Sequence, residues 1–280
     1  MRFHFYKYQA TGNDFVLIDN RTGKLALSVD QVKKICDRKF GIGADGIMLL
    51  ETHPTLDFNL VYYNSDGSQS LCGNGSRAAM HFASLLGMVN GCAAFNAYDG
   101  RHDAELLSTG IVRLKMNDTK EVSVIGDDFQ INTGSPHLIR FVEKVNEYPV
   151  VKEGEKIRYS DTYNEKGINV NFVELLPNNT IFVRTYERGV ENETLSCGTG
   201  VTAAALAVSQ KGYTSPVSIK TLGGELSVEF KSTPLPNRQG QSVLPTPKES
   251  GVLQTGQAGV FQDIFLVGPA KMVFEGDLEL

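Results

Sequence analysis

The octapeptide CGNGSRAA at positions 72–79 recurs as CGTGVTAA at positions 197–204. Each copy follows a strand-like stretch that ends in an aromatic and a polar residue, Tyr63-Asn64 before the first and Tyr186-Glu187 before the second. Repetition of the same parts in the same order is the signature of an internal duplication. The sequence therefore predicts two lobes of similar fold, each presenting C-G-x-G at the start of a helix.

The rest of the chain fits two similar α+β lobes. Thr11-Gly12-Asn13 is echoed by Thr133-Gly134-Ser135. Helices are expected at Val29–Arg38, which Ser28 would cap, and in the Ala-rich stretches Gly75–Leu86 and Gly200–Lys211. Stretches of β-branched and aromatic residues predict strands. They are Phe58–Asn64, Ile111–Met116, Asn169–Leu175, Ile181–Glu187 and Ile264–Val267.

The join between the lobes is expected in the polar break at Asn117–Glu121. We expect residues 1–117 with 266–280 to form the N-terminal lobe and residues 118–265 the C-terminal lobe. A polar stretch at 231–259 carries several prolines and predicts a long loop excursion between two strands.

Composition excludes several classes of protein. The 280 residues are 41% hydrophobic and 21% charged, which is a globular balance. A net charge of −5 without a basic face argues against nucleic acid as a partner. The longest apolar stretch, Val201–Val208, is too short to cross a membrane, and the amino terminus has no apolar signal core. We therefore expect a cytoplasmic protein.

In that reducing compartment we expect the four cysteines to be free thiols. No C-x-x-C pair and no H-x-x-x-H spacing indicates a redox site or a metal site. No metal is expected. The G-x-G-x-x-G at Gly41–Gly46 follows a helical stretch and precedes a strand-like one, which is the reverse of a dinucleotide site. It is interpreted as a loop.

A C-G-x-G at a helix start favours two kinds of chemistry. Its exposed N–H groups and the helix dipole can hold a carboxylate. The same field lowers the pKa of a thiol there, from about 8.5 into a range of roughly 3.5–7.5. A lone cysteine is more often a small buried apolar residue, which is our interpretation of Cys36 and Cys92.

Two such thiols on equivalent points of two facing lobes suit one reaction in particular. Inversion at a carbon needs a base on one face and an acid on the other. Two helix starts can share the carboxylate of an amino acid while its α-carbon becomes carbanion-like. The residues alone thus indicate a cofactor-independent amino-acid racemase or epimerase, with Cys72 and Cys197 as its acid and base.

At the level of motifs the chain resembles the diaminopimelate epimerase family from its first expected strand to its last, apart from the 231–259 excursion. The segments that carry the resemblance are GNDFV (12–16), YYNSDGS (62–68), LCGNGSR (71–77), YERGVENETLSCGTG (186–200) and GPAKMVFEG (268–276). The related proline racemases resemble C-G-H-G at the first cysteine, where this chain has C-G-N-G. The phenazine-pathway relatives lack the cysteine pair.

The resemblance implies two lobes, each a mainly antiparallel sheet wrapped around a central helix. It also implies interconversion of LL- and meso-diaminopimelate without metal, pyridoxal phosphate or nicotinamide, serving lysine and peptidoglycan precursor synthesis. Cys72 would be the proton donor and Cys197 the acceptor in the LL-to-meso direction. A homodimer is expected on the same ground.

The family pattern also implies a set of binding residues. The positions that match those holding the substrate are Asn13, Asn64, Gly73, Asn74, Asn169, Glu187, Arg188, Gly198 and Thr199. His137 and Glu187 match residues that tune the two thiols. Arg188 suits a distal carboxylate, which a guanidinium grips bidentately. The chain departs from the family at Ser135, where relatives carry asparagine, and at Gly46, where some carry a polar side chain.

Each of these residues has a structural alternative. Asn13 and Asn64 could be residues of turns. Glu187 and Arg188 could lie at the solvated end of a strand, and His137 could be a loop residue whose nitrogens are hydrogen-bonded. Two other functions also fit parts of the pattern. A racemase of proline-like substrates would leave Arg188 and the asparagines idle. A binding protein that captures an amino-acid carboxylate would have no use for two thiols.

Overall fold

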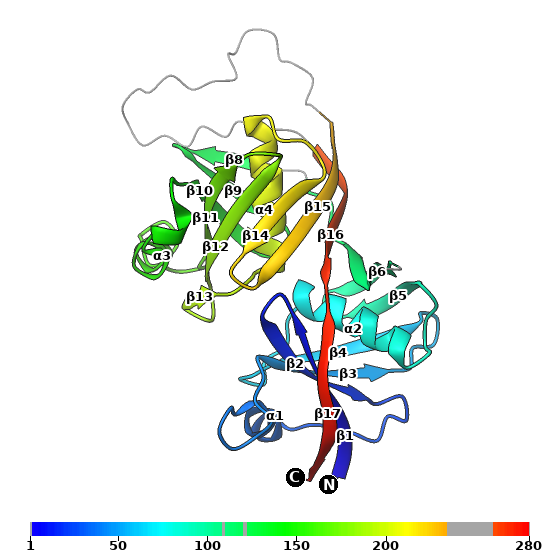
Figure 1. The fold of residues 1–280 in the computed structure, drawn as a ribbon. Coiled ribbons are helices and arrows are strands. Elements are labelled where there is room, and N and C mark those ends of the chain that lie inside the picture. Colours follow the sequence, from blue (N-terminus) through cyan, green and yellow to red (C-terminus); the bar gives the residue numbers. More distant parts are fainter. Residues whose placement is uncertain (1, 108–109, 120–121, 234–259, 280) are drawn as a thin grey trace.

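A computed structural model describes residues 2–107, 110–119, 122–233 and 260–279. Figure 1 shows two lobes joined by the long strands near the carboxyl end of the chain. The described strands form one sheet that continues through both lobes, and four of its strand pairings are parallel while the others are antiparallel. The expected α+β fold of two similar lobes is confirmed.

The first lobe contains two helices. Its elements are β1 (Arg2–Ala10), β2 (Asn13–Asp19), α1 (Val29–Cys36), β3 (Gly46–Glu51), β4 (Phe58–Asn64), α2 (Gly73–Leu85), β5 (Cys92–Ala97), β6 (Gly100–Leu106) and β7 (Ile111–Lys115). Ser28 caps α1 in a capping box with Gln31, as its sequence predicts. Asn13 and Cys72 therefore lie at a strand start and a helix start of the same lobe.

The second lobe repeats this plan. Its elements are β8 (Val122–Ile125), β9 (Asp128–Asn132), β10 (Pro136–Phe141), η1 (Val145–Glu147), α3 (Val150–Arg158), β11 (Asn169–Leu176), β12 (Thr180–Glu187), β13 (Asn192–Thr194), α4 (Gly198–Val208), η2 (Ser209–Lys211), β14 (Val217–Thr221) and β15 (Gly224–Thr233). Its α3 lies between β10 and β11 as α1 lies between β2 and β3, and its α4 corresponds to α2. The last two strands, β16 (Val260–Pro269) and β17 (Lys271–Glu279), return the chain to the first lobe. Helix α3 was not predicted from the sequence.

Strand pairing makes the duplication explicit. In the first lobe β1–β2 is antiparallel, β2–β3 parallel, β3–β4 antiparallel and β4–β5 parallel. In the second lobe β9–β10, β10–β11, β11–β12 and β12–β14 follow in the same alternation. Phe15 pairs with Gly46 in β2–β3, and His137 pairs with Asn169 in β10–β11. Phe15 is thus equivalent to His137, and Gly46 to Asn169. Equivalent positions around the two cysteines can thus be compared directly.

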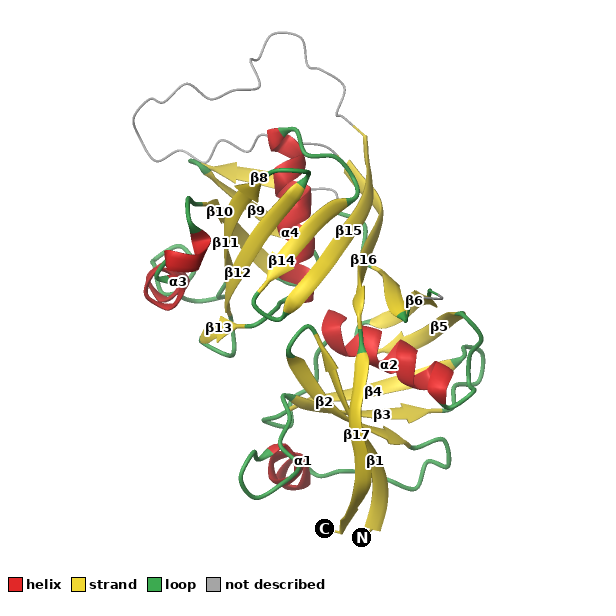
Figure 2. Ribbon diagram, in the orientation of Figure 1, coloured by secondary structure: helices red, strands yellow, loops and turns green. Residues whose placement is uncertain are grey.

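The two central helices are buried on nearly every side, as Figure 2 shows for α4 within its sheet. In α4 every residue except Thr199 is buried, which explains why its Ala-rich sequence lacks a polar face. The sheet wraps around each helix because alanine lets the strands approach closely. This arrangement fixes the amino ends of α2 and α4 where the lobes meet.

Strands β16 and β17 tie the lobes together. β16 pairs with β15 of the second lobe and with β7 of the first, and β17 pairs with β1. Lys231–Thr233, expected in the loop, continue β15 and pair with Val260–Gln262, so the excursion begins later than the sequence indicates. Residues 234–259 lie outside the described part of the chain. Our lobe boundaries stay a prediction.

Candidate active site

The amino ends of α2 and α4 meet at the junction of the lobes, with Cys72 and Cys197 as their N-cap residues. A Cβ atom added to Gly198 would lie 3.5 Å from the Cα atom of Gly73 and 3.0 Å from Leu266 on β16. The two glycine backbones are in close contact, with little room for a side chain at Gly198. The exposed N–H groups of two helix starts therefore converge on one region, which can hold a carboxylate.

Cys72 has one hydrogen-bond donor and one acceptor beside its sulfur. Its Sγ atom accepts from the Gly75 N–H at 3.4 Å and lies 3.6 Å from Asn13 Oδ1. Asn13 donates its amide to Asp45 at 2.6 Å, and because a carboxylate only accepts, the Asn13 oxygen must face Cys72. The same oxygen accepts from Asn74. A thiol at Cys72 thus has an acceptor for its proton.

Cys197 lies at the end of a chain of buried polar groups. Its Sγ atom is 3.5 Å from Thr199 Oγ1, which lies 2.9 Å from His137 Nε2. Asn171 Nδ2 contacts His137 Nδ1 at 3.1 Å and donates to the Leu138 carbonyl, so the amide nitrogen faces the imidazole. His137 therefore accepts at Nδ1, carries its proton on Nε2 and donates to Thr199. The Thr199 hydroxyl is left free to donate to the sulfur.

Burial opposes ionisation in this network. It lowers the pKa of His137 to about 3, with a smaller contribution from Arg188, so the imidazole is neutral. Burial also raises the pKa of Glu187, whose carboxylate accepts from Thr194 Oγ1 at 2.9 Å.

The thiol pKa values differ from the sequence-based expectation. Burial raises the pKa of Cys72 to about 11, although the Gly75 and Asn74 N–H groups and Arg77 act in the opposite direction. Burial raises the pKa of Cys197 further, and Glu187 adds to the rise at both thiols. The direction is opposite to the one expected from the helix starts, because desolvation outweighs the hydrogen bonds and the Arg77 charge that favour the thiolates.

The candidate binding residues for the distal end lie at or next to strand ends. Asn64 ends β4 and donates to Ser68 and Ser70. Glu187 ends β12, and its charge acts on both Cys72 and Cys197. Arg188 follows it, exposed, and its guanidinium donates to the Lys166 carbonyl. This guanidinium remains accessible to an anion.

Asn169 has a different environment from the one its family position suggests. Its side chain is 3% exposed, and it donates to Ser135 Oγ at 2.7 Å and to the Pro136 carbonyl at 3.0 Å. Its oxygen accepts from the Arg188 N–H at 2.9 Å. Asn169 thus fixes the Arg188 backbone, and the shorter Ser135 side chain serves as its partner.

The sequence analysis did not single out three polar residues of the site: Asp45, Arg77 and Asn171. Asp45 orients Asn13, and Asn171 orients His137. The alternation in Asn169-Val170-Asn171 could have identified Asn171, because residues two apart in a strand share a face. Arg77 could have been noticed as a charge inside an Ala-rich helix.

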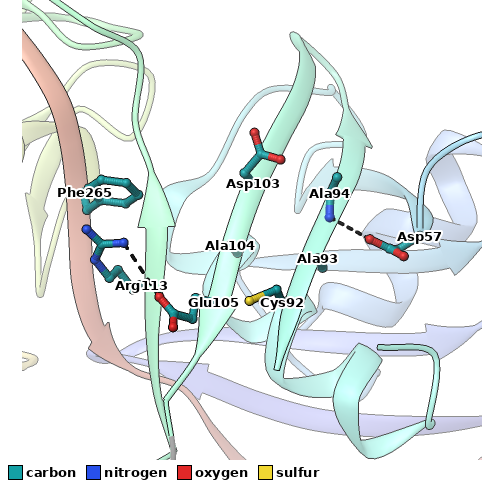
Figure 3. Close-up of a pocket in the computed structure, with 9 residues that line it drawn as sticks. All are labelled: Asp57, Cys92, Ala93, Ala94, Asp103, Ala104, Glu105, Arg113 and Phe265. Carbon is teal, nitrogen blue, oxygen red and sulfur yellow. Dashed lines mark hydrogen bonds and ion pairs between the residues drawn. The ribbon is translucent and has the colours of Figure 1, made fainter. Parts of the chain in front are cut away.

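Other features lie apart from this site. The hollow in Figure 3, of about 370 Å³, is lined by outer positions of β5, β6, β7 and β16, among them Cys92, Arg113 and Phe265. Within the described residues no group of three or more His, Cys, Asp or Glu side chains could hold a metal ion. No helix among them is long and apolar enough to cross a membrane.

Comparison with known proteins gives one consistent family. The model of the family "Diaminopimelate epimerase" matches residues 5–120 and 129–238. A diaminopimelate epimerase of Flavobacterium psychrophilum is 43% identical over 277 residues, covering 96% of this chain and 98% of the relative. That of Chlorobaculum tepidum is 37% identical, with the same coverage of each chain.

Solved structures support the fold. A phenazine biosynthesis protein of Bacillus anthracis superposes with a TM-score of 0.71 at 11% identity, covering all of both chains. A hydroxyproline epimerase of Agrobacterium vitis gives a TM-score of 0.66 at 13% identity, covering 100% of this chain and 93% of the other. These similarities establish the shared two-lobed architecture.

Proposed function

This chain is an isomerase of the diaminopimelate epimerase family, and from that premise we propose that it interconverts LL- and meso-diaminopimelate with Cys72 and Cys197 as its acid and base. The observation that carries the proposal is the meeting of two cysteine-capped helix starts at the junction of the lobes. The family resemblance implies that the reaction needs no cofactor.

The reacting carboxylate would bind to the first N–H groups of α2 and α4, at Gly73, Asn74, Gly198 and Thr199. These groups have no partner within their helices, and both helix dipoles favour negative charge there. As the α-proton leaves, negative charge spreads from the α-carbon into this carboxylate. The two helix starts then stabilise the developing carbanion.

Proton transfer would run from the substrate to Cys197 and from Cys72 to the opposite face in the LL-to-meso direction. The Thr199 hydroxyl can donate to the Cys197 sulfur, which favours a thiolate. The Asn13 oxygen accepts from Cys72, which favours a thiol. A thiolate whose pKa is raised by burial is a stronger base once formed. The contacts of the two sulfurs thus support Cys197 as acceptor and Cys72 as donor.

Recognition of the distal amino acid group would explain why one stereocentre reacts. Arg188 would grip the distal carboxylate, and Asn13, Asn64 and Glu187 would surround the distal ammonium. The exposed Arg188 guanidinium supports the first assignment. Asn169 would contribute mainly by holding the Arg188 backbone in place. A proline-like substrate would leave these groups without partners.

Deuterium incorporation tests this function. The reduced protein is incubated with LL-diaminopimelate in D2O, and each stereocentre is followed in the wild type and in Cys72→Ala and Cys197→Ala. We expect deuterium at one centre together with meso product, and no meso product from either variant. The interpretation of Cys36 as a buried residue is confirmed, whereas Cys92 is exposed and the interpretation of it as buried is wrong. Cys92→Ala changes this exposed cysteine outside the site and should behave as wild type.

Other results would redirect the proposal. Exchange of proline or hydroxyproline but not of diaminopimelate would keep the mechanism and change the substrate. Binding without exchange of any amino acid would favour the binding-protein hypothesis. A homodimer and a cytoplasmic location are proposed on the family resemblance, and the mass in solution by light scattering tests the first.

A further inference from the structure

Arg77 is the largest of the completely buried side chains, and it lies in the first turns of α2. Its hydrogen bonds go to neutral oxygens: Asn74 Oδ1 at 3.1 Å, Thr11 Oγ1 at 3.2 Å and the Gly73 carbonyl at 3.5 Å. Its Nε atom has no hydrogen-bond partner among the described residues. Among the ion pairs of those residues, none includes this guanidinium.

An unpaired buried cation is costly to fold, and here burial lowers the pKa of Arg77 to about 10. The fold itself does not require the charge. At the equivalent position of α4 stands Thr202, also completely buried, whose hydroxyl donates to the Gly198 carbonyl at 2.8 Å. In the second lobe a neutral side chain thus donates a hydrogen bond to the carbonyl that is equivalent to that of Gly73. The charge in the first lobe needs another explanation.

The arginine also controls a contact between the lobes. Since a guanidinium only donates, it fixes the oxygen of the Asn74 amide on its own side. The Asn74 nitrogen then points to the Ser196 carbonyl, at 3.0 Å, and to Asn13 Oδ1. Ser196 immediately precedes Cys197. Arg77 therefore orients the amide that connects the two cysteine-bearing turns.

The field of this cation reaches the reacting groups. Its charge lowers the pKa of Cys72, whereas the carboxylate of Glu187 raises it. The other titratable groups that interact with Cys72 are Cys197 and Tyr62, whose pKa values a negative charge on Cys72 raises. Arg77 is the cation on the first-lobe side of this cluster.

We propose that Arg77 is a positioning residue whose fixed charge is balanced by the reaction itself, through the anion on Cys72 and the substrate carboxylate at the helix starts, while its hydrogen bond orients Asn74. The inference rests on the proposed role of Cys72. Since no carboxylate among the described residues pairs with Arg77, the negative charge that balances it would come from the reaction. The charge would thus act only when substrate or thiolate is present.

Alkylation of Cys72 by two reagents of similar size tests the charge without any substrate. Iodoacetate is an anion and iodoacetamide is neutral, and both need the thiolate, so the ratio of their rates at one pH does not depend on how much thiolate is present. Mass spectrometry of the Cys72 peptide gives each rate. We expect Arg77→Met to lower the iodoacetate-to-iodoacetamide ratio about tenfold, the order expected for one unit charge several ångströms away.

Two further variants separate charge from packing. Arg77→Lys should keep most of the ratio, and Arg77→Thr, which copies the second lobe, should lower it as Arg77→Met does. The ratio at Cys92 should not change in any variant. The onset of Cys72 alkylation with iodoacetamide should move to higher pH in Arg77→Met and Arg77→Thr, by about one unit.

An unchanged ratio at Cys72 in folded Arg77→Met or Arg77→Thr would overturn the proposal, as would equal ratios in the Lys and Met variants. If Arg77→Met does not fold, the rate ratios of Arg77→Lys and Arg77→Thr are compared instead, and equal ratios in these two variants would overturn the proposal. Because the assay uses no amino-acid substrate, its failure is distinct from failure of the epimerase function. That function is tested by deuterium exchange in the wild type.

Discussion

The two cysteine turns have nearly the same backbone and different surroundings. Beneath α2 the first lobe places apolar side chains: a Cβ added at Gly75 would meet Met48 at 2.1 Å. Beneath α4 the equivalent glycine, Gly200, faces Asn171 and His137. The first lobe holds a buried cation where the second holds Thr202. Duplication thus supplied two like helix starts, and side-chain divergence made the two thiols chemically distinct.

The largest effect should come from removing either thiol. Cys72→Ala and Cys197→Ala should each lower kcat/KM for epimerisation at least about 10³-fold, because each removes one partner of the proton transfer. A coupled assay of meso-diaminopimelate formation measures the loss, with Cys92→Ala as control. Activity within tenfold of wild type in either variant would contradict the two-thiol mechanism.

Residual exchange should then separate the two lobes. Cys72→Ala keeps the proposed acceptor, Cys197. It should slowly exchange the α-proton of LL-diaminopimelate for deuterium without forming meso product. Cys197→Ala should exchange the D-centre of the meso isomer instead. Nuclear magnetic resonance of each isomer in D2O measures both. The opposite pattern would exchange the donor and acceptor roles of the two cysteines.

Asn171→Leu makes the second lobe resemble the first, where Met48 stands. The imidazole of His137 then loses the donor that fixes its tautomer, and Thr199 loses its oriented partner. We expect kcat/KM to fall about 10–10²-fold, mostly in kcat, and the free energy of unfolding to fall about 1–3 kcal/mol because buried polar groups lose partners. Steady-state kinetics and urea unfolding measure these changes.

Met48→Leu is the matched control in the first lobe, since it replaces an apolar side chain by another of similar volume. Its effect on kcat/KM should stay within about threefold. Equal losses in the two variants would indicate general disturbance of packing rather than a role for the polar chain at Cys197.

Glu187→Gln should change the pKa of both thiols, whereas the charge of Arg77 acts on Cys72. The Glu187 carboxylate raises the pKa of Cys72 and of Cys197. Removal of its charge lowers both, so the thiolate fraction at pH 8 increases and alkylation by iodoacetamide accelerates, several-fold at each cysteine. Mass spectrometry of the two peptides gives the rates. Acceleration at one cysteine alone would show that the carboxylate serves one lobe.

The smallest effect concerns acid stability. His137 has a pKa of about 3 when folded and an ordinary value of 6.5, so below pH 6.5 the unfolded chain binds a proton that the folded chain does not. Its contribution to stability is therefore complete above pH 6.5 and is lost as the pH falls toward 3. Urea unfolding at pH 7.5 and 5 should show a smaller difference for His137→Gln than for wild type.

Most of the fold was predictable, because its signals are local. The repeated C-G-x-G, the Ser28 cap and the β-branched strands are sequence patterns, and the structure confirms each. Helix α3 was not predictable in this way. It contains Gly154 and has no side-chain cap. The glycine is needed because a Cβ there would lie 2.4 Å from Tyr186, a contact that only the folded chain creates.

By itself the sequence determined the duplication, the family and the two cysteines at helix starts, since these depend on the order of residues along the chain. The tertiary structure decided the environment of each thiol. Burial reverses the expected direction of the thiol pKa values, Asn171 and Asp45 orient His137 and Asn13 from other strands and loops, and Arg77 is left without a carboxylate. Desolvation and electrostatic fields depend on distances between residues far apart in sequence, so only the folded chain defines them.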